Sequence, residues 1–234
     1  MKTNFFDLNS VEFNRLIDSL VQPDYLNFNR MYSQKTIWKY RIKSFAENKS
    51  AKEFINQCNN RNILIWLYTI LKPNDLKNRI IIKTQCAKII SNLLTDTRSL
   101  KAIDTAYNFC VGKAELKELE TAKIYAEKAI TWASKEIFGL ERFLVEIDPP
   151  NNEDRDYNQI KIYTEELNEI YLELFCVTLA FEAVDYETLS ANAELSISGI
   201  PAEFNFLMSQ MVNLCRNKLP FNEIYFDENL VVID

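Results

Sequence analysis

Apolar residues recur every three or four positions along most of this 234-residue chain, which is the spacing of one face of an α-helix. Only three glycines and six prolines interrupt the pattern. We therefore predict an all-α protein, a compact multi-helix bundle of about nine helices. Segments with helical spacing begin after Asn9 and at Ser33, and cover about 50–58, 61–71, 76–94, 97–111, 114–138, 157–184, 187–196 and 202–217.

Some polar and small residues indicate where these helices begin and how they pack. Asn9 followed by Glu12 has the spacing of a capping box, and Gly112 suits a left-handed helix C-cap. A row of alanines at i, i+4, i+7 and i+11 lets another helix approach closely; it consists of Ala122, Ala126, Ala129 and Ala133. The predicted core includes Trp66, Leu67, Ile89, Ile90, Leu93, Phe109, Ala126, Ala129, Leu172, Phe175 and Leu179.

Two segments depart from the helical pattern. Residues 146–156 contain tandem prolines, two asparagines and an excess of acidic residues, which predicts an exposed loop. Residues 221–234 contain two β-prone runs around Asp-Glu-Asn, which predicts a short C-terminal β-hairpin. We expect one helical domain over 1–234. The alternative is a subdivision at this loop, into a basic or neutral part, 1–145, and an acidic part, 157–234.

Residues 94–99 read Leu-Thr-Asp-Thr-Arg-Ser, and an Ala-rich helix, Gly112 and a second Ala-rich helix follow. This order, over about 94–129, resembles a stretch found in many uncharacterised bacterial proteins, which has no established activity. It predicts two helices joined by a tight turn, with Asp96 or Thr97 as the cap of the first. Arg98 fits a structural role beside an acidic group, and a ligand site formed by Asp96 and Arg98 is the alternative.

Composition excludes several kinds of chemistry. The chain has no histidine, which excludes Ser-His-Asp and Cys-His nucleophiles and His-ligated metal centres. Its three glycines are far apart, unlike those of phosphate-binding loops. The five cysteines form no Cys-x-x-Cys pair and fit reduced core thiols. We therefore expect no cofactor and no metal-binding residues.

Hydropathy and cysteine usage bear on the compartment. The N-terminus has no apolar run long enough for a signal peptide. The most apolar stretch, 63–71, is shorter than the roughly 20 residues that span a bilayer. We expect a cytoplasmic protein that does not interact with a membrane.

Charge is divided unevenly along the chain, although the net charge is only −6. Residues 1–93 contain 15 Lys and Arg against 7 Asp and Glu, and residues 94–234 contain 12 against 26. The acidic part predicts a protein-interaction module with a basic protein partner. An immunity-type inhibitor of a basic toxin is one form of this hypothesis, by class analogy. The candidate partner-binding residues are Glu153, Asp154, Asp156, Glu165, Glu169 and Glu173.

The basic part offers an alternative partner. Lys35, Lys39 and Lys43 recur at i, i+4 and i+8, with Arg41 and several aromatic residues nearby. A basic helix face with aromatic residues can hold phosphates and stack bases. A nucleic-acid-binding module over 30–52 is therefore the second hypothesis, and a solvated lysine face is the simpler interpretation of the same pattern.

A third hypothesis is enzymatic. Glu166-x-x-Glu169 and Glu182-x-x-Asp185 resemble the carboxylate pairs of all-α nucleotide pyrophosphohydrolases of the MazG type. That resemblance implies carboxylates on facing helices that hold Mg²⁺ around a triphosphate. No turn-forming residue separates the two pairs here, so one continuous helix would place Glu166 and Glu182 about 24 Å apart. The sequence therefore leans against an enzyme.

Overall fold

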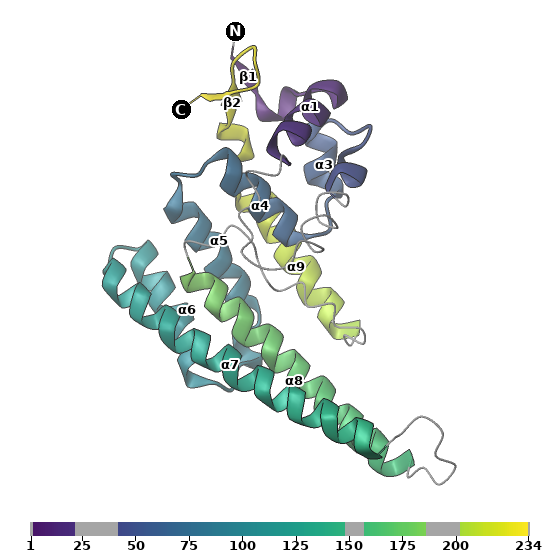
Figure 1. Ribbon diagram of the computed structural model, residues 1–234. Coiled ribbons are helices and arrows are strands. Elements are labelled where there is room, and N and C mark those ends of the chain that lie inside the picture. The colour runs from purple at the N-terminus through teal and green to yellow at the C-terminus, as the bar shows by residue number, and fades with distance from the viewer. Residues whose placement is uncertain (1, 22–41, 148–156, 186–201, 234) are drawn as a thin grey trace. The chain divides into compact units, whose positions relative to one another are not determined.

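The structure is a computed structural model that describes residues 2–21, 42–147, 157–185 and 202–233 (Figure 1). It confirms the predicted all-α fold with a small C-terminal hairpin. Its contacts divide the chain into two units, residues 1–75 with 212–234 and residues 76–211. The predicted helix from Ser33 lies largely outside the described residues, and the one over 187–196 lies entirely outside them.

The helices of the first unit are short and well capped. They are α1 (Ser10–Leu20), α3 (Ala51–Gln57), α4 (Arg61–Leu71) and the last turns of α9 (Ala202–Lys218). The predicted capping box is present, because Asn9 accepts hydrogen bonds from the first turn of α1 while Glu12 bonds back to the Asn9 N–H. Ser50 and Glu53 repeat this arrangement before α3.

The two ends of the described chain meet in a small antiparallel sheet. Its strands are β1 (Thr3–Asn4), β2 (Tyr225–Phe226) and β3 (Val232–Ile233), in the order β1-β2-β3. β2 and β3 form the predicted hairpin. β1 was not predicted, because two residues cannot show an alternating pattern. A 3₁₀ turn follows each of β1 and α9, at Phe5–Asp7 and Phe221–Glu223, and stacks Phe5 on Phe221 at 5.1 Å.

The second unit contains α5 (Leu76–Ile89), the 3₁₀ turn Ser91–Leu93, α6 (Thr97–Cys110), α7 (Leu116–Ile147) and α8 (Tyr157–Val184). In Figure 1, α7 and α8 run side by side, with α5 and α6 packed along them. Contacts of Lys123 with Asp185 and of Glu141 with Tyr171 show that α7 and α8 are antiparallel.

The alanine row of α7 lies where the sequence predicts close helix packing. Ala122, Ala126, Ala129 and Ala133 are all buried, and α7 packs on both α6 and α8. Gly112 has a φ of 73° and turns the chain between α6 and α7, also as predicted. The structure corrects the predicted end of α7. The predicted helix stops at Phe138, whereas α7 passes through Gly139 and reaches Ile147.

Most of the predicted core is buried, with four exceptions. Trp66, Phe175 and Leu179 are among the buried residues, whereas Leu93 is 36% exposed. Leu93 lies in the 3₁₀ turn after α5, so the helical spacing that predicted its burial does not apply there. The other three exceptions are half-buried: Ile89, Phe109 and Leu172.

Two further expectations concern cysteines and membranes. All five cysteines are buried thiols, as predicted. Burial raises the pKa of Cys58 to about 11 and that of Cys176 to about 12, which keeps both thiols protonated. Among the described residues, no helix has both the length and the apolar composition needed to cross a membrane.

Candidate functional site

The acidic face of α8 is the part of the predicted partner-binding surface that the structure describes. Glu165 and Glu169 lie one turn apart and are exposed, and Glu166 between them is exposed as well. Lys161 lies 3.9 Å from Glu165, an exposed i, i+4 pair of the kind that contributes little energy. The other predicted residues, Glu153, Asp154 and Asp156, lie outside the described residues.

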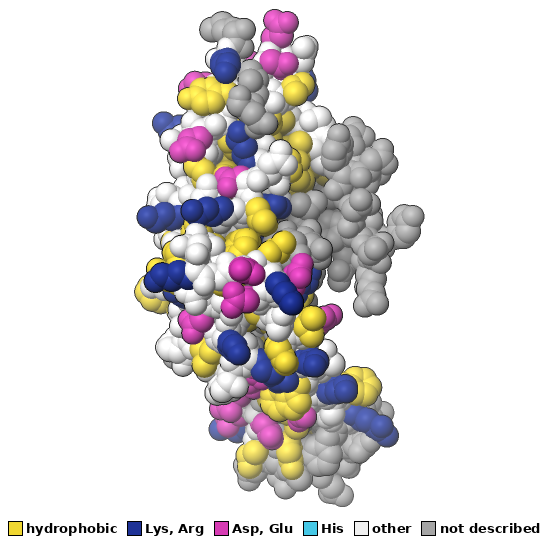
Figure 2. Space-filling view, turned by 90° about the vertical axis from the view of Figure 1, so that its left-hand side faces the viewer, with side chains coloured by type: hydrophobic (Ala, Val, Ile, Leu, Met, Phe, Trp, Pro, Cys, Tyr) yellow, Lys and Arg dark blue, Asp and Glu magenta, His cyan; other side chains and the backbone are white. Residues whose placement is uncertain are grey.

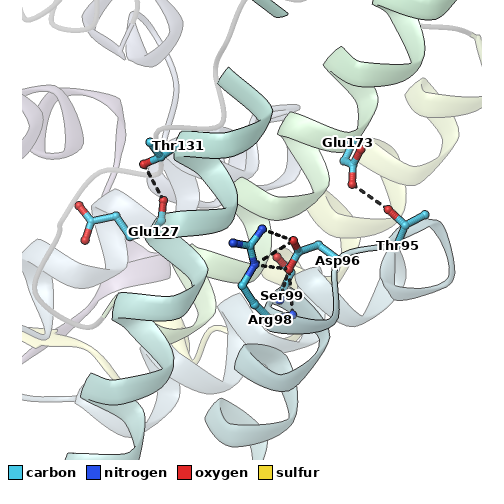
Figure 3. Close-up of polar contacts among 7 residues, drawn as sticks. All are labelled: Thr95, Asp96, Arg98, Ser99, Glu127, Thr131 and Glu173. Carbon is cyan, nitrogen blue, oxygen red and sulfur yellow. Dashed lines mark hydrogen bonds and ion pairs between the residues drawn. The ribbon is translucent and has the colours of Figure 1, made fainter. Parts of the chain in front are cut away.

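Glu173 differs from the other predicted carboxylates. It is half-buried, and its carboxylate accepts a 2.7 Å hydrogen bond from the Thr95 hydroxyl (Figure 3). Thr95 lies in the connection before α6, so this contact ties that connection to α8. The sequence groups Glu173 with Glu165 and Glu169, but only the latter two are exposed. The exposed acidic face is therefore formed by Glu165, Glu166 and Glu169.

Asp96 and Arg98 form a closed local contact at the start of α6. Asp96 Oδ1 accepts hydrogen bonds from the backbone N–H groups of Arg98 and Ser99, at 2.8 and 3.1 Å, and so caps the helix. The Arg98 guanidinium also donates to both oxygens of the Asp96 carboxylate (Figure 3). These contacts favour the structural interpretation of both residues over a ligand site.

The hydrogen bonds at the start of α6 also determine the pKa of Asp96. Partial burial alone would raise the pKa of Asp96, but the hydrogen bonds from Arg98 and Ser99 outweigh it and hold the pKa below its ordinary value. Asp96 therefore stays ionised and keeps capping α6 at neutral pH. Because its hydrogen-bonding capacity is directed to its own helix, it is poorly placed to bind anything else.

The structure separates the two carboxylate pairs that resemble a magnesium site. α8 is one continuous helix from Tyr157 to Val184, so Glu166 and Glu182 are about 24 Å apart along its axis. Glu166 is exposed, whereas Glu182 and Asp185 are buried. The described residues contain no group of three or more Cys, Asp or Glu side chains able to hold a metal ion.

A buried ionic contact at the end of α8 has no counterpart in the sequence-based predictions. Lys123 of α7 lies 2.8 Å from the Asp185 carboxylate, and Lys83 of α5 donates a 2.9 Å hydrogen bond to the Asp185 carbonyl. Asp185 and Lys83 are both almost fully buried. The sequence drew attention to Asp185 only through its spacing from Glu182, and no pattern along the chain identifies its lysine partners.

The basic segment that predicts nucleic-acid binding is described only at its end. Lys35, Lys39 and Arg41 lie outside the described residues. Lys43 is described, and its ammonium forms an ion pair with Asp18 of α1. That contact directs Lys43 towards its own unit, and the predicted role of the other three residues stays a prediction.

The surface charge as a whole is mixed on the face that Figure 2 draws. Lysine and arginine, acidic and hydrophobic side chains are interspersed there, without a broad field of one sign. No protein-family model, curated protein or solved structure matches the chain.

Proposed function

We propose that this protein is a non-enzymatic interaction module that binds a basic protein partner through the exposed α8 carboxylates Glu165, Glu166 and Glu169. The observation that carries the proposal is their joint exposure on one continuous helix, where Lys161 is the only cation near them on α8. A cluster of like charges in an ordered helix attracts an opposite charge and accelerates association.

An inhibitor of the immunity type is the concrete form that we favour, by class analogy. Such a protein neutralises a basic toxin by covering it, and so needs an ordered acidic surface but no catalytic group. Two features support this form: the absence of histidine from the chain, and the distance between the two carboxylate pairs of α8.

Affinity capture from a lysate of the source organism, with and without nuclease, tests the proposal. The bait proteins are the wild type, the variant Glu165→Lys with Glu169→Lys, and a control, Asp104→Lys with Glu228→Lys. The control makes the same change in net charge at two exposed residues that do not belong to α8.

We expect the wild type and the control to retain one basic protein after nuclease treatment, and the α8 variant to lose it. High salt should release that protein from both, because exposed charges are screened. Equal retention by all three proteins, or recovery of nucleic acid alone, would reject the α8 face as the binding site.

A further inference from the structure

The cover over α8 ends partway along the helix. Every α8 residue from Leu174 to Val184 is buried except Phe181, whereas none is buried from Ile160 to Glu173. Apolar residues in this earlier stretch, such as Leu167 and Ile170, stay half-buried. The change falls between two neighbouring residues, so it marks the point where a covering element ends.

The lengths of the helices explain this change. α5 and α6 pack on α8, but each contains 14 residues, against 32 in α7 and 28 in α8. The later part of α7, 138–147, and the earlier part of α8, 157–173, therefore extend beyond α6 as a two-helix arm (Figure 1).

Two hydrogen bonds distinguish the sides of this arm. Tyr171 of α8 donates to Glu141 of α7 on one side. Glu173 follows Tyr171 by two residues, which is about 200° around the helix, and accepts its hydrogen bond from Thr95 just before α6. α6 packs on both α7 and α8. The side away from the Tyr171 contact is therefore the side that α6 covers in the rest of the unit.

The α8 residues on this side form a stripe of carboxylates that ends in an apolar residue. Glu169, Glu166 and Ile162 precede Glu173 by four, seven and eleven residues, which is the spacing of one helix face. Glu166 and Glu169 are exposed, and Ile162 is 61% exposed. The stripe thus continues, without cover, from the point where α6 begins.

α7 adds another carboxylate to the same side. Glu136 is exposed, and it precedes Glu141 by five residues, as Glu166 precedes Tyr171. Five residues correspond to about 140° around a helix, so both carboxylates point away from the Tyr171–Glu141 contact. We name this surface, which consists of Glu136, Ile162, Glu166 and Glu169, the arm face.

The cations on and beside the arm point elsewhere. Among the described residues they are Lys135, Arg142 and Lys161. Helical geometry places Lys135 and Arg142 about 100° and 120° around α7 from Glu136. It places Lys161 about 100° around α8 from Ile162. The arm face therefore combines negative charge with an exposed apolar side chain.

We propose that the basic partner places an amphipathic helix on the arm face, in line with α6. This inference rests on the proposed function and names the element of the partner that binds. A helix fits because α6 already occupies the same side of α7 and α8 in the rest of the unit. Its lysines and arginines would meet Glu166 and Glu169, and its apolar side chains would meet Ile162, as in other complexes of a helix with a helical surface.

Two other occupants fit the arm face less well. The carboxylates repel the phosphates of a nucleic acid. In a symmetric pair of two copies, the same surface patch meets itself, so the carboxylates of one arm face would oppose those of the other.

Fluorescence anisotropy with the full-length protein and a labelled peptide probe tests the inference. The probe is an amphipathic peptide of about 18 residues, or five turns, whose leucines recur at i, i+3, i+4 and i+7 among lysines. A scrambled peptide of the same composition is the control. We expect the wild type to bind the amphipathic peptide about tenfold more tightly, and high salt to weaken that binding. Equal affinities for the two peptides, or no binding of either, would overturn the inference.

Two pairs of substitutions assign the binding to the arm face. Glu166→Lys and Ile162→Ala should each weaken binding of the amphipathic peptide about fivefold, because they remove a charge and an apolar contact. The matched controls are Glu127→Lys and Ile124→Ala, at exposed positions on other faces of α7, and should leave binding unchanged. Equal effects within either pair would contradict the assignment.

Affinity capture separates a failure of this inference from a failure of the proposed function. If the wild type captures a basic protein but does not prefer the amphipathic peptide, the proposed function stands and the helix is rejected. If no basic protein is captured, both are rejected, because the inference describes that partner.

Discussion

Asp185 is a buried residue that lysines from two other helices contact, one through its carboxylate and the other through its backbone carbonyl. Its ion pair with Lys123 joins the end of α8 to α7, and its backbone carbonyl accepts a hydrogen bond from Lys83 of α5. Removing one partner of a buried pair leaves the other charge uncompensated, whereas apolar replacement of both is often tolerated. The stability of the packing at the end of α8 should therefore depend on the ion pair between Lys123 and Asp185.

We expect Lys123→Met to lower the free energy of unfolding by about 3 kcal/mol, because the Asp185 carboxylate stays buried without this ammonium. The double variant Lys123→Met with Asp185→Leu should recover part of the loss. Urea denaturation followed by circular dichroism measures both. Lys128→Met, at an exposed position on the same helix, is the control, and a loss as large as that of Lys123→Met would contradict a specific role for the buried pair.

Arg216 has a comparable role in the first unit. Its guanidinium donates hydrogen bonds to the carbonyls of Ile55 and Cys58, at 3.1 and 2.7 Å, at the end of α3. These carbonyls lack partners within their own helix, and a planar guanidinium can reach both at once.

Arg216→Lys should therefore destabilise the first unit by about 2 kcal/mol, because a lysine ammonium cannot reproduce the forked geometry. Hydrogen exchange of the α3 amides provides the measurement, and faster exchange there is the expected result. Lys218→Arg is the matched control, because Lys218 is exposed and lies two residues further along α9. This substitution should not alter hydrogen exchange of the α3 amides. Unchanged α3 protection in the Arg216 variant would show that the cap is dispensable.

At the scale of the helix pair, one contact between α7 and α8 depends on pH. The hydrogen bond that Tyr171 donates to Glu141, together with partial burial, raises the pKa of Tyr171 from 10 to about 12. The folded state therefore holds the phenol proton more tightly than the unfolded state. The contribution of the protonated Tyr171 phenol to stability is complete below pH 10, which is the pKa of this group in the unfolded chain. It is lost as the pH rises towards about 12, the pKa in the folded protein.

We expect the urea midpoint of the wild type to fall above pH 10 more steeply than that of Tyr171→Phe, which has no phenol to ionise. Tyr125→Phe is the control, because Tyr125 is exposed on the outer face of α7. Parallel pH profiles for the wild type and Tyr171→Phe would show that this hydrogen bond does not contribute to stability.

The elements themselves differ in how far the sequence predicts them. α8 begins and ends at Tyr157 and Val184 as expected, because a proline-rich segment precedes it and its apolar spacing is continuous. The predicted end of α7 at Phe138 was wrong, because Gly139 does not end the helix. An isolated glycine within a long helix costs only about 1 kcal/mol. The hairpin was predicted from local β-prone runs, whereas β1 is a partner from the other end of the chain.

At the scale of the whole molecule, the sequence locates the acidic residues but not their surroundings. The exposure of Glu165 and Glu169 follows from their helical spacing opposite apolar residues. The burial of Asp185 and the contact of Glu173 with Thr95 depend on helices that are distant in sequence. No periodicity along one segment reports such contacts, which is why the buried ionic contact was missed.

The division into two units leads to a last prediction. Phe226 is fully buried in the first unit, and Phe175 is almost fully buried in the second. Truncating either ring to alanine should cost about 3–5 kcal/mol. If each unit opens by itself, Phe226→Ala will speed hydrogen exchange in α1 and α3, and Phe175→Ala will do so in α6 and α7.

The two variants act as controls for each other, because each removes the same ring from a different core. The expected result is a reciprocal pattern, in which the unit without the substitution keeps its wild-type protection. Loss of protection in both units from either substitution would mean that the chain unfolds as one cooperative body. The reciprocal pattern would also show that the α7 and α8 surfaces persist when the first unit opens, because both helices belong to the second unit.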